Sequence, residues 1–93
     1  MKKCLKIRVC GKVQGVAYRA HAQKHAQNLG IEGTVQNTDD GSVMIYACGS
    51  AANLEKFIDY LYQGTTNSHI EDLLAEPFMN EKDFRGAFRI IGD

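Results

Sequence analysis

Two segments of the sequence carry residue types that could bind and act on a phosphate-like anion. Residues 11–17, GKVQGVA, contain two glycines between a predicted strand and a predicted helix, and Arg19 follows in the first helical turn. Free N–H groups at a helix N-terminus favour negative charge, and glycine lets the backbone approach an anion closely. The guanidinium of Arg19 adds a fixed fork of donors that matches a phosphoryl group. A tight turn followed by a surface arginine would give the same spacing, so the pattern alone leaves both interpretations open.

The hydrophobic pattern predicts the elements that position these residues. Residues 3–10 alternate between apolar and polar, which is typical of a strand with one buried face. Residues 18–29 have the helical period, with one apolar stripe. The other predicted elements are strands at 31–38 and 42–48 around a 39–41 hairpin turn, a helix capped by Ser50 and ended by Gly64, and strands at 70–75 and 84–91.

This order, β-α-β-β-α-β with an extra terminal strand, is the ferredoxin-like split βαβ arrangement. We therefore predict one α+β domain over residues 1–93, an antiparallel sheet with two helices on one face. The first strand should lie between the third and the fourth, with the second beside the third. The loop at 11–17 and Asn37 then share one sheet edge, about 10 Å apart. A small anion held by the loop would lie within reach of Arg19 and Asn37.

Composition excludes several classes of protein. A chain of 93 residues is too short for a multidomain enzyme or a TIM barrel. Eleven basic residues balance eleven acidic ones, which argues against general nucleic-acid or membrane-surface binding. No apolar run approaches the roughly 18 residues that span a bilayer, and we expect a cytoplasmic protein. Three cysteines without a C-x-x-C pair predict no metal site.

Two of the cysteines should face each other. Setting Ile7 opposite Ile45 in antiparallel first and third strands directs their apolar residues to the core. The same register places Cys4 opposite Cys48, on the sheet face away from the helices. This pair could form a disulfide if oxidised. Two reduced thiols are the alternative, which a reducing cytosol favours.

Both polar segments resemble signatures of the acylphosphatase family. Residues 11–19, GKVQGVAYR, match G-x-V-Q-G-V-x-[FY]-R, and residues 33–43, GTVQNTDDGSV, match G-x-V-x-N-x-x-D-G-x-V. The resemblance extends from about residue 4 to residue 91. It implies the ferredoxin-like fold and an enzyme that hydrolyses the carboxyl-phosphate bond of a small-molecule acyl phosphate, without a metal or other cofactor. Thr34 stands where the family often has an aromatic residue, and no Gly-Pro pair follows the second helix. We expect a monomer.

The resemblance also implies roles by position. Arg19 would bind the phosphoryl group, and Asn37 would orient the attacking water. An amide does not take up a proton near neutral pH, so Asn37 would accept a hydrogen bond from water instead of acting as a base. We hypothesise that a phosphate oxygen of the substrate takes the proton. The phosphate oxygens would be held by the backbone around Gln14, Gly15, Val16, Ala17 and Tyr18, together with Arg19.

The remaining polar and aromatic residues near these segments are expected to be structural. His21 and His25 lie four residues apart, and a solvated helix face is a more economical interpretation than a general base. Asp39 and Asp40 would repel a phosphate and are expected to form the turn. Tyr18 is expected in the core, and the side chain of Gln14 is expected to support the loop.

Two alternatives remain. A ferredoxin-like domain can also be a non-catalytic module that binds an anion or RNA. Residues 84–91, FRGAFRII, echo part of an RNA-binding signature, although they lie on the last predicted strand instead of a central one. A maturation-type acylphosphatase-like domain without turnover would retain the loop, so an activity assay must separate it from an enzyme.

Overall fold

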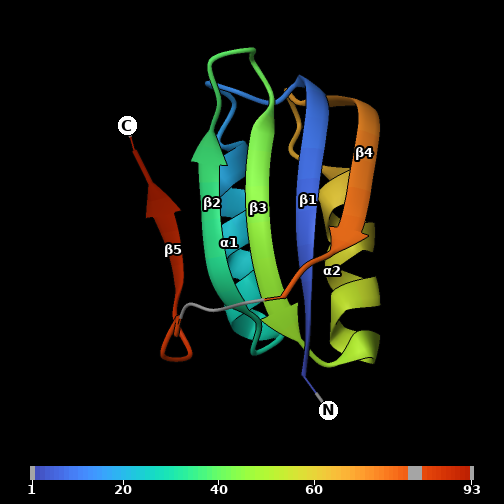
Figure 1. Ribbon diagram of the computed structural model, residues 1–93. Helices are drawn as coiled ribbons and strands as arrows, with labels where there is room; N and C mark the ends of the chain where they lie inside the picture. The colour runs from blue at the N-terminus through green and yellow to red at the C-terminus, as the bar shows by residue number, and fades with distance from the viewer. Residues whose placement is uncertain (1, 80–82, 93) are drawn as a thin grey trace.

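The computed structural model describes residues 2–79 and 83–92, in which one five-stranded sheet packs against two helices (Figure 1). Both helices lie on the same face of the sheet, as predicted. The strand order is β4-β1-β3-β2-β5. The elements are β1 (Lys3–Lys12), α1 (Tyr18–Asn28), β2 (Glu32–Asn37), β3 (Val43–Gly49), α2 (Ala51–Gln63), β4 (His69–Pro77) and β5 (Phe88–Ile91).

The register of the central strands follows from their alternating pattern. β1 and β3 pair antiparallel, with Ile7 opposite Ile45 and Cys4 opposite Cys48, as the sequence predicts. Apolar residues at every second position then point toward the helices, where all but the partly buried Leu5 are fully buried. They pack with Tyr18, Phe57 and Leu61 in the core. β1 continues to Lys12, two residues beyond the predicted strand, so the loop that leaves the sheet spans residues 13–17.

The last strand differs from the prediction in direction and length. β5 pairs with β2 in parallel, so the sheet is mixed and not wholly antiparallel. β4 and β5 occupy opposite edges, and β5 begins at the end of the sheet where β4 finishes (Figure 1), so its direction matches that of β2. Residues 84–87 form a turn instead of a strand. Arg85 and Gly86 both have positive φ there, and the N–H of Ala87 donates to the carbonyl of Phe84. The strand was predicted to begin at residue 84 because the apolar residues of this turn continue the hydrophobic pattern of β5.

The second helix begins and ends where the sequence predicts. The Ser50 hydroxyl accepts a hydrogen bond from the N–H of Asn53 at 3.1 Å, which caps the first turn of α2. Gly64 follows its last residue with φ 64°. Across residues 2–79 and 83–92, no helix is long and apolar enough to cross a membrane.

Candidate active site

The loop between β1 and α1 adopts a left-handed conformation at two positions. Gly15 has φ 72°, and Ala17 has φ 61° and ψ 21°. Such conformations turn successive N–H groups toward a common centre, forming a concave nest for an anion. Ala17 is also the N-cap of α1 and offers no side chain that could accept from the first N–H groups of the helix. The loop therefore points unsatisfied donors and the positive end of the helix dipole at one place.

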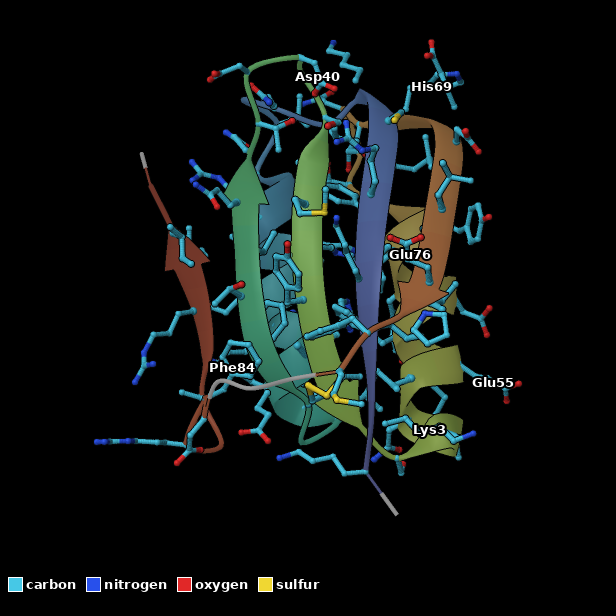
Figure 2. The ribbon with its side chains drawn as sticks, viewed as in Figure 1. Lys3, Asp40, Glu55, His69, Glu76 and Phe84 are labelled. Carbon is cyan, nitrogen blue, oxygen red and sulfur yellow. A yellow bond between two sulfur atoms is a disulfide. The ribbon has the colours of Figure 1, made fainter. Side chains whose placement is uncertain are left out.

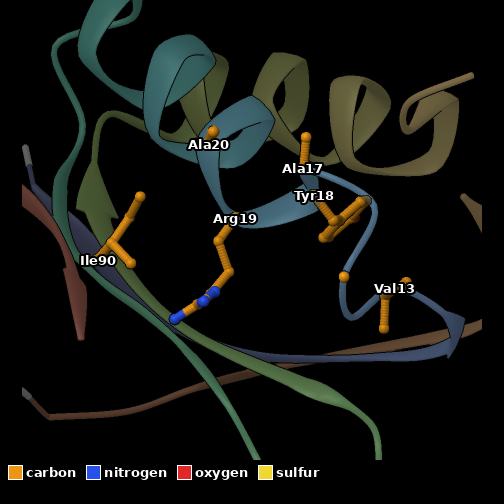
Figure 3. Close-up of a pocket in the computed structure, with 7 residues that line it drawn as sticks. Val13, Ala17, Tyr18, Arg19, Ala20 and Ile90 are labelled. Atoms are coloured by element: carbon orange, nitrogen blue, oxygen red, sulfur yellow. The ribbon is translucent and has the colours of Figure 1, made fainter. Parts of the chain in front are cut away.

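A hollow of about 200 Å³ lies against this loop (Figure 3). It is large enough for a phosphoryl group and some water, since one water occupies about 30 Å³ in the liquid. The side chain of Arg19 points from the first turn of α1 toward the sheet (Figure 3). The lining residues are Val13, Gly15, Ala17, Tyr18, Arg19, Ala20 and Ile90.

The guanidinium of Arg19 lies beside the strand end that carries Asn37. Its Nη1 donates to the carbonyl of Ile91 at 3.3 Å. Ile91 is opposite Gln36 in the β2–β5 pairing, and Asn37 is the next residue of β2. The structure thus brings Arg19 and Asn37, the two residues that the sequence singled out, to the same end of the sheet.

The side-chain amide oxygen of Asn37 is a hydrogen-bond acceptor that receives no donor from the described residues. This Oδ1 atom is buried. Leaving a polar atom in this state costs about 1–3 kcal/mol, so such atoms are rare outside sites that receive water or a ligand. An amide oxygen that lacks a donor can hold a water molecule by one of its protons.

Side chains on both sides hold the loop in place. The side chain of Gln14 supports the loop, as predicted, and does so by binding the β2–β3 hairpin: its Nε2 donates to the carbonyls of Thr38 and Ser42 at 2.8 and 2.9 Å. The side-chain N–H groups of Gln14 are therefore occupied by the hairpin carbonyls, and only the backbone N–H of Gln14 remains for an anion. On the other side, Thr65 Oγ1 donates to the carbonyl of Val16 at 2.8 Å. Sequence reasoning missed Thr65, because no spacing rule connects positions 49 residues apart.

The protein-family model described as Acylphosphatase matches residues 5–90 of this chain. The chain belongs to the acylphosphatase family. It is 54% identical over 59 residues to an acylphosphatase of Shewanella amazonensis, and 50% identical over 58 residues to one of an Azoarcus species. These matches take in 63% and 62% of this chain and span 65% and 59% of the relatives' lengths.

The likeness of structure is more extensive. The crystal structure of acylphosphatase from Bacillus subtilis superposes with a TM-score of 0.91 at 30% identity, covering 99% of this chain and all of that one. The ferredoxin-like α+β fold predicted from the sequence is therefore confirmed, together with the resemblance to the family.

Tyr18, whose position is aromatic in the family signature, belongs to the core as predicted. Its hydroxyl donates to the carbonyl of Leu61 at 2.7 Å, and burial raises the pKa of this phenol well above its usual range. The ring thus links α1 to α2 and anchors the start of α1. Tyr18 is 1% exposed and also lines the hollow.

His21 and His25 do not form the solvated face that the sequence suggested. His21 Nε2 lies 2.8 Å from the carbonyl of Tyr60, and the His25 ring stacks on the Tyr60 ring at 3.8 Å between centroids. Burial lowers the pKa of His25, and the neighbouring His21 and Lys24 lower it further. Both imidazoles are half-buried between α1 and α2, because helix packing reaches further around α1 than its apolar stripe indicates. Neither lines the hollow.

Cys4 and Cys48 form a disulfide on the sheet face away from the helices (Figure 2). Of the two alternatives that the sequence left open, the structure contains the bonded pair, while Cys10 is a free thiol. Cys48 is fully buried. Over the described part of the chain, no group of three or more His, Cys, Asp or Glu side chains is arranged to hold a metal ion.

Proposed function

We propose that this chain is an acylphosphatase, which hydrolyses the carboxyl-phosphate bond of a small acyl phosphate to a carboxylate and inorganic phosphate. The observation that carries the proposal is the donor-rich loop at the start of α1, facing the same sheet edge as Arg19 and the unpartnered Oδ1 of Asn37. Relatives named acylphosphatase support it. We further propose that it acts as a cytoplasmic monomer that needs no cofactor and binds neither nucleic acid nor membrane.

The geometry supports a direct transfer of the phosphoryl group to water. Backbone N–H groups of residues 14–18 and the Arg19 guanidinium hold the phosphoryl oxygens and stabilise their charge. Asn37 Oδ1 accepts a hydrogen bond from a water molecule and fixes its line of attack. A bond forms between the water oxygen and phosphorus, and the bond from phosphorus to the carboxyl oxygen breaks. The carboxylate leaves with the electron pair, and a phosphate oxygen takes the proton of the water.

The test is phosphate release from benzoyl phosphate by the wild type and two variants. Arg19→Ala and Asn37→Ala should each lower kcat by about 10²- to 10³-fold, the usual effect of removing a group that stabilises or positions a transition state. Arg89→Ala and Asn67→Ala are matched controls on exposed residues and should leave kcat unchanged. Circular dichroism must show that all variants are folded. Near-normal turnover by a folded Arg19→Ala or Asn37→Ala variant would sink the proposal.

The RNA-binding alternative loses its main support in the structure. Recognition of single-stranded RNA on a sheet needs aromatic rings exposed for stacking with bases. Phe84 and Phe88, the aromatic residues of the 84–91 segment, are 8% and 2% exposed. A mobility-shift titration with single-stranded RNA should therefore show no complex. A non-catalytic anion-binding module would bind inorganic phosphate but release none from benzoyl phosphate.

A further inference from the structure

An ion pair outside the phosphate-binding loop holds the hairpin between β2 and β3. Asp40 lies at the tip of this hairpin (Figure 2), and its Oδ2 accepts a hydrogen bond from Arg8 Nη1 at 2.6 Å. The same nitrogen donates to Ser42 Oγ at 3.1 Å. Arg8 stands on β1, on the sheet face away from the helices. A side chain from the neighbouring strand therefore grips the turn that follows Asn37.

The second carboxylate oxygen of Asp40 accepts hydrogen bonds from both ends of the turn. Oδ1 accepts from the Thr38 hydroxyl at 2.5 Å, and from the Ser42 hydroxyl and backbone N–H at 2.6 and 3.0 Å. The Ser42 hydroxyl, followed by the Thr38 hydroxyl, holds the pKa of this carboxyl well below its usual range, so Asp40 is charged at neutral pH. One carboxylate thus fixes the conformation of residues 38–42.

The ends of this turn are also the points where the hairpin meets the site. Thr38 directly follows Asn37, and the carbonyls of Thr38 and Ser42 accept the two hydrogen bonds from Gln14. A continuous series of contacts therefore leads from Arg8 through Asp40 to the turn, and from the turn to Asn37 on one side and the phosphate-binding loop on the other. The arrangement of Asn37 relative to the loop depends on the shape of the turn.

The solvent exposure of Arg8 and Asp40 indicates that their ion pair does not serve mainly to stabilise the fold. The side chains of Arg8 and Asp40 are 39% and 59% exposed, and ion pairs this accessible contribute little to stability. Removing the Arg8 side chain should leave the fold intact while freeing the turn from β1, so that it can shift relative to the sheet. A small displacement of a positioned group is enough to cost a large factor in rate.

We propose that Arg8 and Asp40 are a positioning pair for the hydrolysis, which sets where Asn37 holds the attacking water relative to the phosphate-binding loop. The inference rests on the proposed function. Loss of the pair spoils the line of attack, whereas Arg19 and the loop N–H groups still bind the phosphoryl group. Its signature is a lower kcat with an unchanged KM for benzoyl phosphate.

Lys6 provides a matched control for Arg8. It lies two residues earlier on β1 and therefore on the same face, so Lys6→Ala removes the same charge from the same strand. Arg8→Ala should lower kcat about 5- to 20-fold with KM within about twofold of wild type. Lys6→Ala should keep both constants within about twofold. Equal effects of the two variants would show that charge alone matters and would overturn the proposal.

A conservative variant sharpens the test. Both hydrogen bonds of Arg8 come from the single atom Nη1, so a lysine ammonium can replace them. Arg8→Lys should restore kcat to within about threefold of wild type, and Arg8→Ala combined with Asp40→Asn should cost little more than Asp40→Asn alone. Failure of lysine to restore kcat, or fully multiplicative losses in the double variant, would contradict a positioning pair.

A measurement without substrate distinguishes this inference from the proposed function. Side-chain amide signals of Asn37 and Gln14 in ¹⁵N NMR spectra should shift in Arg8→Ala and stay in place in Lys6→Ala. Unchanged signals in Arg8→Ala would overturn the positioning role even if benzoyl phosphate is hydrolysed. Shifted signals would support it even if the wild type releases no phosphate, a result that would defeat the proposed function alone.

Discussion

Gln14→Ala isolates the connection between the loop that precedes α1 and the β2–β3 hairpin. The substitution removes both hydrogen bonds from Gln14 Nε2 to the carbonyls of Thr38 and Ser42. It leaves the loop backbone, Arg19 and Asn37 unaltered. The loop and the hairpin should then move more freely relative to one another.

The magnitude of the stability loss follows from what the two carbonyls retain. Each neutral hydrogen bond contributes about 1 kcal/mol, which sets an upper value of about 2 kcal/mol. The Thr38 carbonyl keeps the N–H of Gly41 at 3.2 Å, and the Ser42 carbonyl keeps the N–H of Thr38 at 2.9 Å. Neither is orphaned, so the free energy of unfolding should fall by about 1–2 kcal/mol. The urea midpoint should fall by roughly 0.5–1 M.

Turnover should fall further than stability requires. We expect kcat for benzoyl phosphate about tenfold lower in Gln14→Ala, because Asn37 and the loop are no longer held together. Gln14→Glu should in addition raise KM, since a carboxylate places negative charge beside the bound phosphoryl group and cannot donate to either carbonyl.

Gln23→Ala is the matched control for this experiment. Gln23 Nε2 donates to the carbonyl of Phe88 at 3.0 Å, a bond of the same kind away from the loop. Its loss should lower the free energy of unfolding by about 1 kcal/mol with no change in kcat. If Gln14→Ala behaves like Gln23→Ala, with reduced stability and normal turnover, the connection has no part in catalysis.

Three further predictions concern the fold. Gly33 has φ 150°, and a Cβ there would lie 1.7 Å from the Tyr46 carbonyl oxygen, so Gly33→Ala should cost about 3 kcal/mol or more in urea unfolding; a loss below about 1 kcal/mol would contradict the tight β2–β3 pairing. Reducing the Cys4–Cys48 disulfide, which closes a separation of 44 residues, should lower the free energy of unfolding by about 4 kcal/mol with unchanged kcat, and equal urea midpoints with and without reductant would argue against the bond. Because the pKa of Asp40 is lowered in the folded protein, its stabilising effect is present above the usual carboxyl pKa and is lost as pH falls; the stability gap between wild type and Asp40→Asn should shrink below about pH 4, and a gap independent of pH would refute this.

Local patterns were sufficient to predict the centre of the fold. Alternation in β1 and β3 determines their register, because a shift by one residue would turn the apolar side chains of the shifted strand to the opposite face of the sheet. That register places Cys4 opposite Cys48, as the structure confirms. The glycines and Arg19 indicated the loop, and topology brought Asn37 to the same sheet edge.

The remaining features depend on contacts between distant segments. The stacking of His25 on Tyr60 arises from how the helices meet, which the pattern of one helix does not report. The parallel direction of β5 depends on the path of the chain between opposite edges of the sheet. The contact between Arg8 and Asp40 joins positions 32 residues apart, although a hydroxyl residue on each side of the turn is a local signal that an aspartate can exploit.

The proposed hydrolysis requires that a water molecule, oriented by Asn37, attacks a phosphoryl group held by the loop and Arg19. Hydrolysis of benzoyl phosphate in ¹⁸O-labelled water tests it most directly, with both products analysed by mass spectrometry. We expect release of inorganic phosphate well above the uncatalysed rate, with one ¹⁸O atom in the phosphate and none in the benzoate. Label in the benzoate, or release no faster than in buffer, would contradict it.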